Sequence, residues 1–111
     1  MNYLNELTPE SELRFNNLVI SPCYRNVLLY NAILDLTTKE FDVLYFLASH
    51  PGWAFTKRQI YEAVWGEECF CNHHAVENII YQLRRKMDKN ASNTQFIQTL
   101  IGYGYKFIAK P

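Results

Sequence analysis

The chain has 111 residues, of which 49% are hydrophobic and 15% aromatic, so it has the composition of one folded globular domain rather than a disordered segment. No apolar run approaches the ~18 residues of a membrane span, and the first residues lack the basic and apolar regions of a secretory signal. Three cysteines, an odd number, favour a reducing compartment over a disulfide framework, so the expected location is the cytoplasm.

The charges are distributed unevenly along the chain. Eleven basic and eleven acidic residues give a formal net charge of zero. Residues 1–55 carry three basic and six acidic side chains, whereas residues 78–111 carry six basic side chains and one acidic one. Because contacts with phosphates dominate nucleic-acid affinity, a nucleic-acid site is expected toward the C-terminal end.

The first third of the chain predicts a short tail followed by a small β-sheet. Residues 1–12 are polar and acidic and show no periodicity, so we expect a tail or linker before a domain that spans residues 13–111. Within residues 13–36, short apolar runs are separated by turn signals at Ser21-Pro22 and Asn31. This pattern predicts two or three antiparallel strands with tight turns.

Two helices are expected next, each introduced by a capping box. Thr37 and Glu40 are spaced so that the hydroxyl accepts from the Glu40 amide while the carboxylate reaches back, and Thr56 and Gln59 repeat this spacing. The first helix should stop before a Pro-Gly pair and the second at Gly66. Their predicted buried faces are Phe41, Leu44, Leu47 and Ala48 in the first helix, and Ile60, Ala63 and Val64 in the second.

A third, amphipathic helix is predicted over about residues 72–88. Its apolar residues recur at helical spacing and should form the buried face: Val76, Ile80, Leu83 and Met87. The opposite face carries side chains that can touch base edges or phosphates: Asn78, Tyr81, Gln82 and Arg85. After it, residues 96–100 and 105–108 read as two strands joined at Gly102-Tyr103-Gly104. The expected fold is therefore α+β, with a short N-terminal antiparallel sheet, three helices and a C-terminal β-hairpin, which is the winged helix-turn-helix plan.

Within this plan, the residues resemble the OmpR/PhoB-type DNA-binding domain of bacterial two-component response regulators over roughly residues 13–108. The matching motifs are Leu36-Thr37-x-x-Glu40-Phe41-x-x-Leu44, His50-Pro51-Gly52, Val64-Trp65-Gly66, Val76-Glu77, Ile80, Leu83-Arg84-x-Lys86, Ile97-x-Thr99 and Gly102-x-Gly104-Tyr105-x-Phe107. Each fragment alone is weak, but all of them in this order are specific.

The resemblance implies an effector domain that binds double-stranded DNA and regulates transcription, with the third helix in the major groove and a second copy on direct-repeat half-sites. The side chains expected near bases are Ala75, Asn78, Tyr81 and Gln82. Those expected near the DNA backbone are Trp65, His74, Arg84, Arg85, Lys86, Thr99 and Lys106.

The chain departs from the family pattern where relatives carry positive charge. His74 stands where relatives usually have arginine, and Tyr81 and Gln82 occupy positions that are often basic. At the wing, Ile101 replaces the arginine that would enter the minor groove. We therefore expect weaker DNA binding with a shallower salt dependence than is typical, with a log–log slope no steeper than about −6.

Two other interpretations concern the segment before the third helix. Its acidic and aromatic side chains Glu67, Glu68 and Phe70 make it a candidate surface for RNA polymerase, which would suit a protein adaptor with weakened DNA binding. Cys69 and Cys71, with two histidines nearby, would suit a metal-responsive regulator, but their spacing differs from structural zinc sites and no metal is expected.

No pattern of catalytic residues is present in the sequence. There is no identifiable nucleophile–base pair, no paired carboxylates at a useful spacing and no Gly-rich phosphate loop. An enzyme is not expected, and neither is a cofactor or a small-molecule substrate.

Overall fold

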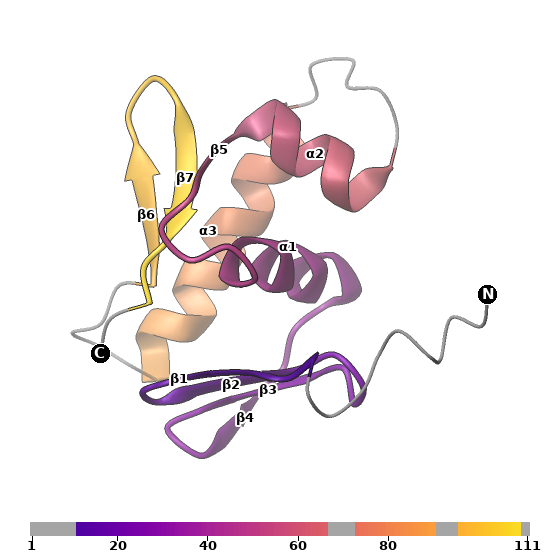
Figure 1. The fold of residues 1–111 in the computed structure, drawn as a ribbon, viewed down its shortest axis with the longest axis vertical. Coiled ribbons are helices and arrows are strands. Elements are labelled where there is room, and N and C mark those ends of the chain that lie inside the picture. Colours follow the sequence, from indigo (N-terminus) through magenta and orange to yellow (C-terminus); the bar gives the residue numbers. More distant parts are fainter. Residues whose placement is uncertain (1–10, 67–72, 91–95, 110–111) are drawn as a thin grey trace.

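The computed structural model describes residues 11–66, 73–90 and 96–109, with side chains omitted at residues 89 and 90. Within these residues, a four-stranded antiparallel sheet comes first, and three helices and a three-stranded antiparallel sheet follow (Figure 1). This order confirms the predicted winged helix-turn-helix plan. The elements are β1 (Leu13–Phe15), β2 (Leu18–Ser21), β3 (Asn26–Leu29), β4 (Ala32–Leu34), α1 (Thr38–Ala48), β5 (Ala54–Thr56), α2 (Lys57–Trp65), α3 (His73–Asn90), β6 (Ile97–Leu100) and β7 (Gly104–Phe107).

The N-terminal sheet has the strand order β1-β2-β3-β4 and lies beneath the helices (Figure 1). Two or three strands were predicted, and the structure has four. The missed strand is β1, whose three residues are too short to show an alternation of their own but pair with β2 from Leu13 to Phe15. Between β3 and β4, Tyr30 and Asn31 both have positive φ, as a two-residue hairpin turn requires.

Both predicted capping boxes are present. The Thr37 hydroxyl accepts from the Glu40 amide at the start of α1, and the Thr56 hydroxyl accepts from the Gln59 amide at the start of α2. All four predicted core residues of α1 are buried, and Gly66 ends α2 in the left-handed conformation.

The predicted buried face of α2 is partly wrong. Ile60 is fully buried, but Ala63 is exposed, and Tyr61 is buried in its place. The Tyr61 ring stacks on Trp65 with 4.9 Å between centroids, so two aromatic rings rather than a small methyl group form this side of the helix. A large ring removes more apolar surface from water than an alanine does. Burial of Tyr61 therefore favours turning α2 about its axis so that Tyr61, rather than Ala63, faces the core.

The wing is a three-stranded sheet with the order β5-β7-β6. No strand was predicted between the first two helices, whereas the structure pairs β5 with β7 through Phe55 opposite Tyr105. The hairpin is thereby held by the connection between α1 and α2. At Gly104, an added Cβ would collide with the carbonyl oxygen of Phe55, so this close pairing depends on glycine.

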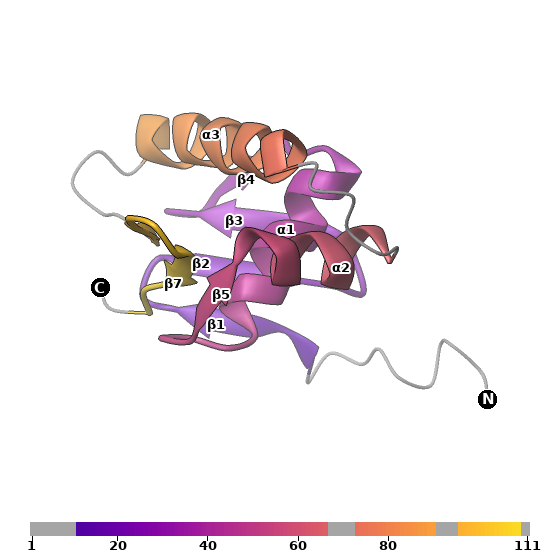
Figure 2. The same cartoon turned by 90° about the horizontal axis from the view of Figure 1, so that it is seen from above.

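The helix α3 packs its apolar stripe into the core. Val76, Ile80, Leu83 and Met87 are all at most 2% exposed, which confirms the predicted face. The helix extends to Asn90, two residues beyond the predicted end. Seen from above, α3 lies along one side of the molecule, with α1 and α2 on its inner side (Figure 2). No helix in the described ranges is long and apolar enough to cross a membrane.

Candidate nucleic-acid interface

The outer face of α3 is a stripe of polar and aromatic side chains, which we call the reading face. Residues three and four positions apart share one side of a helix. Because the apolar side of α3 is buried, the polar side faces outward. His74, Asn78, Tyr81 and Arg85 are exposed, and Gln82 is half-buried beside them. The Arg85 guanidinium lies 5.9 Å from the centre of the Tyr81 ring, so cation and ring form one surface. Ala75, by contrast, is half-buried and packs against the core.

An ion pair joins the first turn of α2 to the second turn of α3. Lys57 Nζ lies 2.5 Å from Glu77 Oε2, and His74 Nδ1 lies 3.3 Å from Glu77 Oε1. The hydrogen bond from Lys57 lowers the pKa of Glu77, and the same bond raises the pKa of Lys57. The N-terminal part of α3 is therefore held against α2 through Glu77, while the His74 side chain stays 89% exposed.

Two of the predicted backbone contacts, Arg84 and Thr99, are hydrogen-bonded to each other. Arg84 Nη2 lies 2.5 Å from Thr99 Oγ1 and 3.0 Å from the carbonyl oxygen of Ile97, and the guanidinium lies 5.6 Å from the centre of the Tyr105 ring. Its Nε is buried and has no hydrogen-bond partner among the described residues. These contacts attach the wing to α3 through the Arg84 side chain.

Lys86 lies on the inner side of α3 and pairs with a buried carboxylate. Its Nζ is 2.6 Å from Glu40 Oε1, and Glu40 is only 4% exposed. Arg85, the next residue, is exposed instead. A phosphate would have to compete with Glu40 for Lys86, whereas Arg85 faces outward.

The wing carries its charge away from its tip. Lys106 stands opposite Gln98, on the sheet face that alternates with the buried Tyr105 and Phe107. The turn itself is apolar and exposed: Ile101 is 96% and Tyr103 51% exposed.

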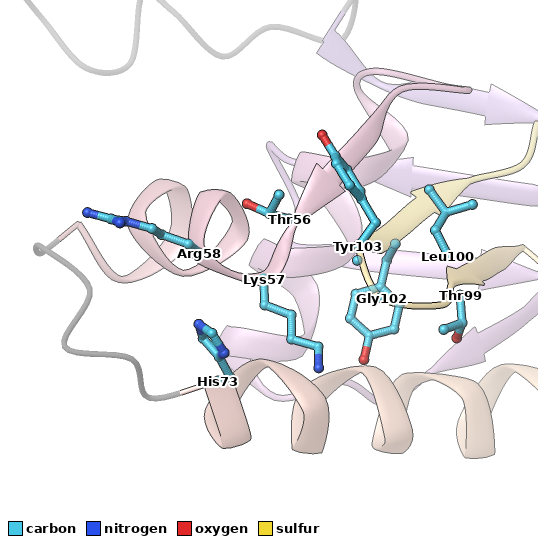
Figure 3. A pocket seen from close by; sticks show the side chains of 10 residues that line it. Thr56, Lys57, Arg58, His73, Thr99, Leu100, Gly102 and Tyr103 are labelled. Carbon is cyan, nitrogen blue, oxygen red and sulfur yellow. The ribbon is translucent and has the colours of Figure 1, made fainter.

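A hollow of about 540 Å³ separates the wing from the starts of α2 and α3 (Figure 3). Thr56, Lys57, Arg58 and His73 line its helical side. The Lys57 side chain runs toward α3, and Arg58 points away from the wing (Figure 3). Lys57 and Arg58 were not identified from the sequence as candidate site residues. Their signal was two basic residues directly after the Thr56 capping box, at the N-terminus of a helix that must lie beside α3.

The remaining predicted residues divide between the described and undescribed parts of the chain. Trp65 is half-buried, with Lys39 Nζ 5.2 Å from its ring. The suggested polymerase surface (Glu67, Glu68 and Phe70) and the cysteines Cys69 and Cys71 lie outside the described residues. Within the described ranges, no group of three metal-ligating side chains comes together.

Comparisons with known proteins match this chain to transcriptional regulators. A family model described as "Transcriptional regulatory protein, C terminal" matches residues 31–107. An uncharacterized transcriptional regulatory protein of Bacillus subtilis, YcbL, is 38% identical over 94 residues, which are 85% of this chain and 42% of that protein. The heme response regulator HssR of Staphylococcus aureus is 35% identical over 101 residues, which are 90% of this chain and 44% of that protein. The chain thus spans less than half the length of these relatives.

Solved structures with the same fold include DNA-binding domains. The Klebsiella pneumoniae RstA DNA-binding domain in complex with the RstA box has a TM-score of 0.79 and 30% identity, covering 88% of this chain and 97% of that one. The DNA-binding domain of CpxR from E. coli also has a TM-score of 0.79, with 29% identity, covering 90% of this chain and 98% of that one.

Proposed function

The chain belongs to the OmpR/PhoB-type family of transcriptional regulatory C-terminal domains, and on this basis we propose that α3 reads a specific DNA sequence in the major groove. Membership makes it a DNA-binding domain of a transcription regulator rather than a member of an enzyme family. The observation that carries the finer proposal is the reading face, an outward polar stripe opposite a fully buried one.

The reading face has the chemistry that base recognition needs. The amides of Asn78 and Gln82 can pair bidentately with adenine N6 and N7, which only the major groove presents together. Tyr81 stands between them on the same face and can contact a base or a phosphate. Ala75 is half-buried at the margin of this face, and its small side chain lets the first turns of the helix approach a thymine methyl closely.

The backbone contacts are proposed in two groups. Arg85 and His74 are exposed at opposite ends of the reading face and can contact phosphates directly. Trp65, Arg84, Lys86, Thr99 and Lys106 complete the proposed set, of which Arg84, Thr99 and Lys86 also hold the domain together.

We further propose binding as two copies on direct-repeat half-sites. A single module buries only roughly 600–1,000 Å² on DNA, which limits its affinity, and a second copy multiplies the contact. Regulation of transcription by the whole protein would follow from occupancy of such a site.

Selection of bound sequences from a random duplex library tests the proposal. We expect a conserved motif, repeated at a spacing of about one helical turn, 10–10.5 base pairs. A library that yields no motif would contradict sequence-specific reading. If the immobilised chain then retained RNA polymerase, the adaptor function suggested by Glu67, Glu68 and Phe70 would be favoured instead.

A further inference from the structure

The wing ends in an apolar tip that faces solvent. Between Thr99 and Tyr105 the chain has no charged side chain. Ile101 is 96% exposed, and the turn that presents it is fixed by Gly102, with φ of 77°, and by a hydrogen bond of 2.9 Å from the Tyr103 amide to the carbonyl oxygen of Leu100. The turn therefore presents Ile101 and Tyr103 to solvent as an uncharged tip.

The position of this tip relative to α3 identifies what would cover it. His73, in the first turn of α3, and Gly102 and Tyr103 of the wing line opposite sides of one hollow of about 540 Å³ (Figure 3). Thr56 adds a hydroxyl to the helical side, and Lys57 adds a cation that is paired with Glu77. A hollow with these donors, open between a groove-reading helix and a hairpin, is suited to one sugar–phosphate strand.

On a DNA duplex, a single sugar–phosphate strand separates the major groove from the minor groove. If α3 occupies the major groove, a hairpin across that strand reaches the adjacent minor groove. Resting on the proposed function, we infer that the wing tip enters the minor groove as an apolar wedge, with Ile101 pressed against a base step and Tyr103 against the flanking sugars.

This inference specifies what the wing recognises. An uncharged tip gains nothing from the negative potential of a narrow groove, so its selectivity must come from how easily the DNA opens. Apolar side chains inserted from the minor groove unstack and kink a base step, and pyrimidine–purine steps such as TA yield most readily. The wing therefore selects a deformable TA or CA step on the minor-groove side of the site read by α3.

The test uses the full chain and the selected duplex. Each base step next to the motif is made TA in one duplex and AA in a matched duplex, and the affinities of the two are compared. An adenine analogue that fluoresces on unstacking, 2-aminopurine, is placed at the same steps. For the unaltered chain we expect about fivefold tighter binding to one TA duplex, together with a fluorescence increase at that step. Ile101→Ser should lose both effects while the salt slope stays unchanged, because no cation is removed.

A matched variant controls for the loss of an exposed isoleucine. Ile33 is 74% exposed on β4, in the N-terminal sheet, and Ile33→Ser should behave as the unaltered chain does. Ile101→Ser that keeps the TA preference and the fluorescence change would overturn the inference. A defect of Ile101→Ser seen only on duplexes with two half-sites would also overturn it, because the tip would then touch a second copy. Failure of the proposed function is distinguishable, since the unaltered chain would then select no motif.

Discussion

Glu40 Oε1 accepts hydrogen bonds from Lys86 Nζ at 2.6 Å and from the Thr37 amide at 3.0 Å. One buried oxygen therefore links the N-terminal cap of α1 to the C-terminal half of α3. A carboxylate that is only 4% exposed must be paired, because an uncompensated charge in the interior is costly.

Lys86→Met should therefore reduce the stability of the fold. Removing one member of a buried pair costs about 3–5 kcal/mol, and we expect roughly 3 because the Lys86 side chain is 33% exposed. Chemical denaturation measures the free energy of unfolding. Arg85→Met, at an exposed neighbour, is the control and should change it by only roughly 0.5 kcal/mol. A Lys86→Met variant of full stability would show that Glu40 does not depend on this partner.

Arg85→Met should instead alter DNA binding. If Arg85 contacts one phosphate, its loss should weaken binding to all sequences alike and reduce the magnitude of the log–log salt slope by about 0.9. A salt titration on the selected duplex measures this slope. An unchanged slope for Arg85→Met would remove Arg85 from the set of phosphate contacts.

Gln82→Ala should weaken recognition at one base pair only. Loss of a bidentate amide–adenine pair costs about 1–3 kcal/mol at the contacted position and nothing elsewhere. Affinities for a series of single-base variants of the site measure the pattern. Gln98→Ala, on the outer face of the wing sheet, is a matched control and should retain the unaltered pattern. A uniform loss across all sites would mean that Gln82 contacts the backbone or supports α3.

Gly104→Ala should separate β5 from the wing hairpin. The new methyl group would overlap the Phe55 carbonyl, so we expect a loss of about 3 kcal/mol in unfolding free energy, at the upper end of overpacking effects. Gly102→Ala meets no atom within 4 Å, and its cost of roughly 1 kcal/mol should come from its positive φ alone. Equal losses for the two variants would contradict the close contact.

The ion pair of Lys57 and Glu77 predicts a loss of stability in acid. The hydrogen bond from Lys57, with smaller contributions from the charges of Lys57 and His74, holds the pKa of Glu77 below its ordinary value of 4.5. A carboxyl group with a lowered pKa in the folded state stabilises the fold above its unfolded pKa. This contribution disappears as the pH falls from 4.5 toward the lower folded value.

Glu77→Gln should therefore flatten the acid side of the stability curve, measured by denaturation at a series of pH values. Glu62→Gln, which removes an exposed pair with Arg58 within α2, is the control and should have the smaller effect. An acid limb as steep in Glu77→Gln as in the unaltered chain would contradict the assignment.

The sequence predicted those parts of the fold that depend on short-range patterns. The two capping boxes and the buried stripe of α3 follow from spacings of three and four residues, and the structure has both. It did not predict that β5 would join the wing, because this pairing is decided by Phe55 and Tyr105, which are 50 residues apart. The sequence also did not predict which side of α2 is buried. The spacing of Ala63 from Ile60 suggested that Ala63 faces the core, but the stacked rings of Tyr61 and Trp65 form that side instead.

The candidate site was predicted in a similar way. The reading face is the complement of the apolar stripe, so its exposed residues could be inferred from periodicity. The partners of Arg84 and Lys86 could not, because each lies on another element: Thr99 on the wing and Glu40 on α1. Long basic side chains look alike in a sequence, and only the fold separates those that brace the domain from those that face outward.

The pairing of β5 with β7 also determines when the wing can form. β5, which precedes α2, completes its sheet only with β7 at residues 104–107, and closing so long a loop must precede this contact. During synthesis, the helix-turn-helix segment therefore leaves the ribosome before its wing can assemble. A chain truncated before β7 would therefore carry α3 without the three-stranded sheet of the wing.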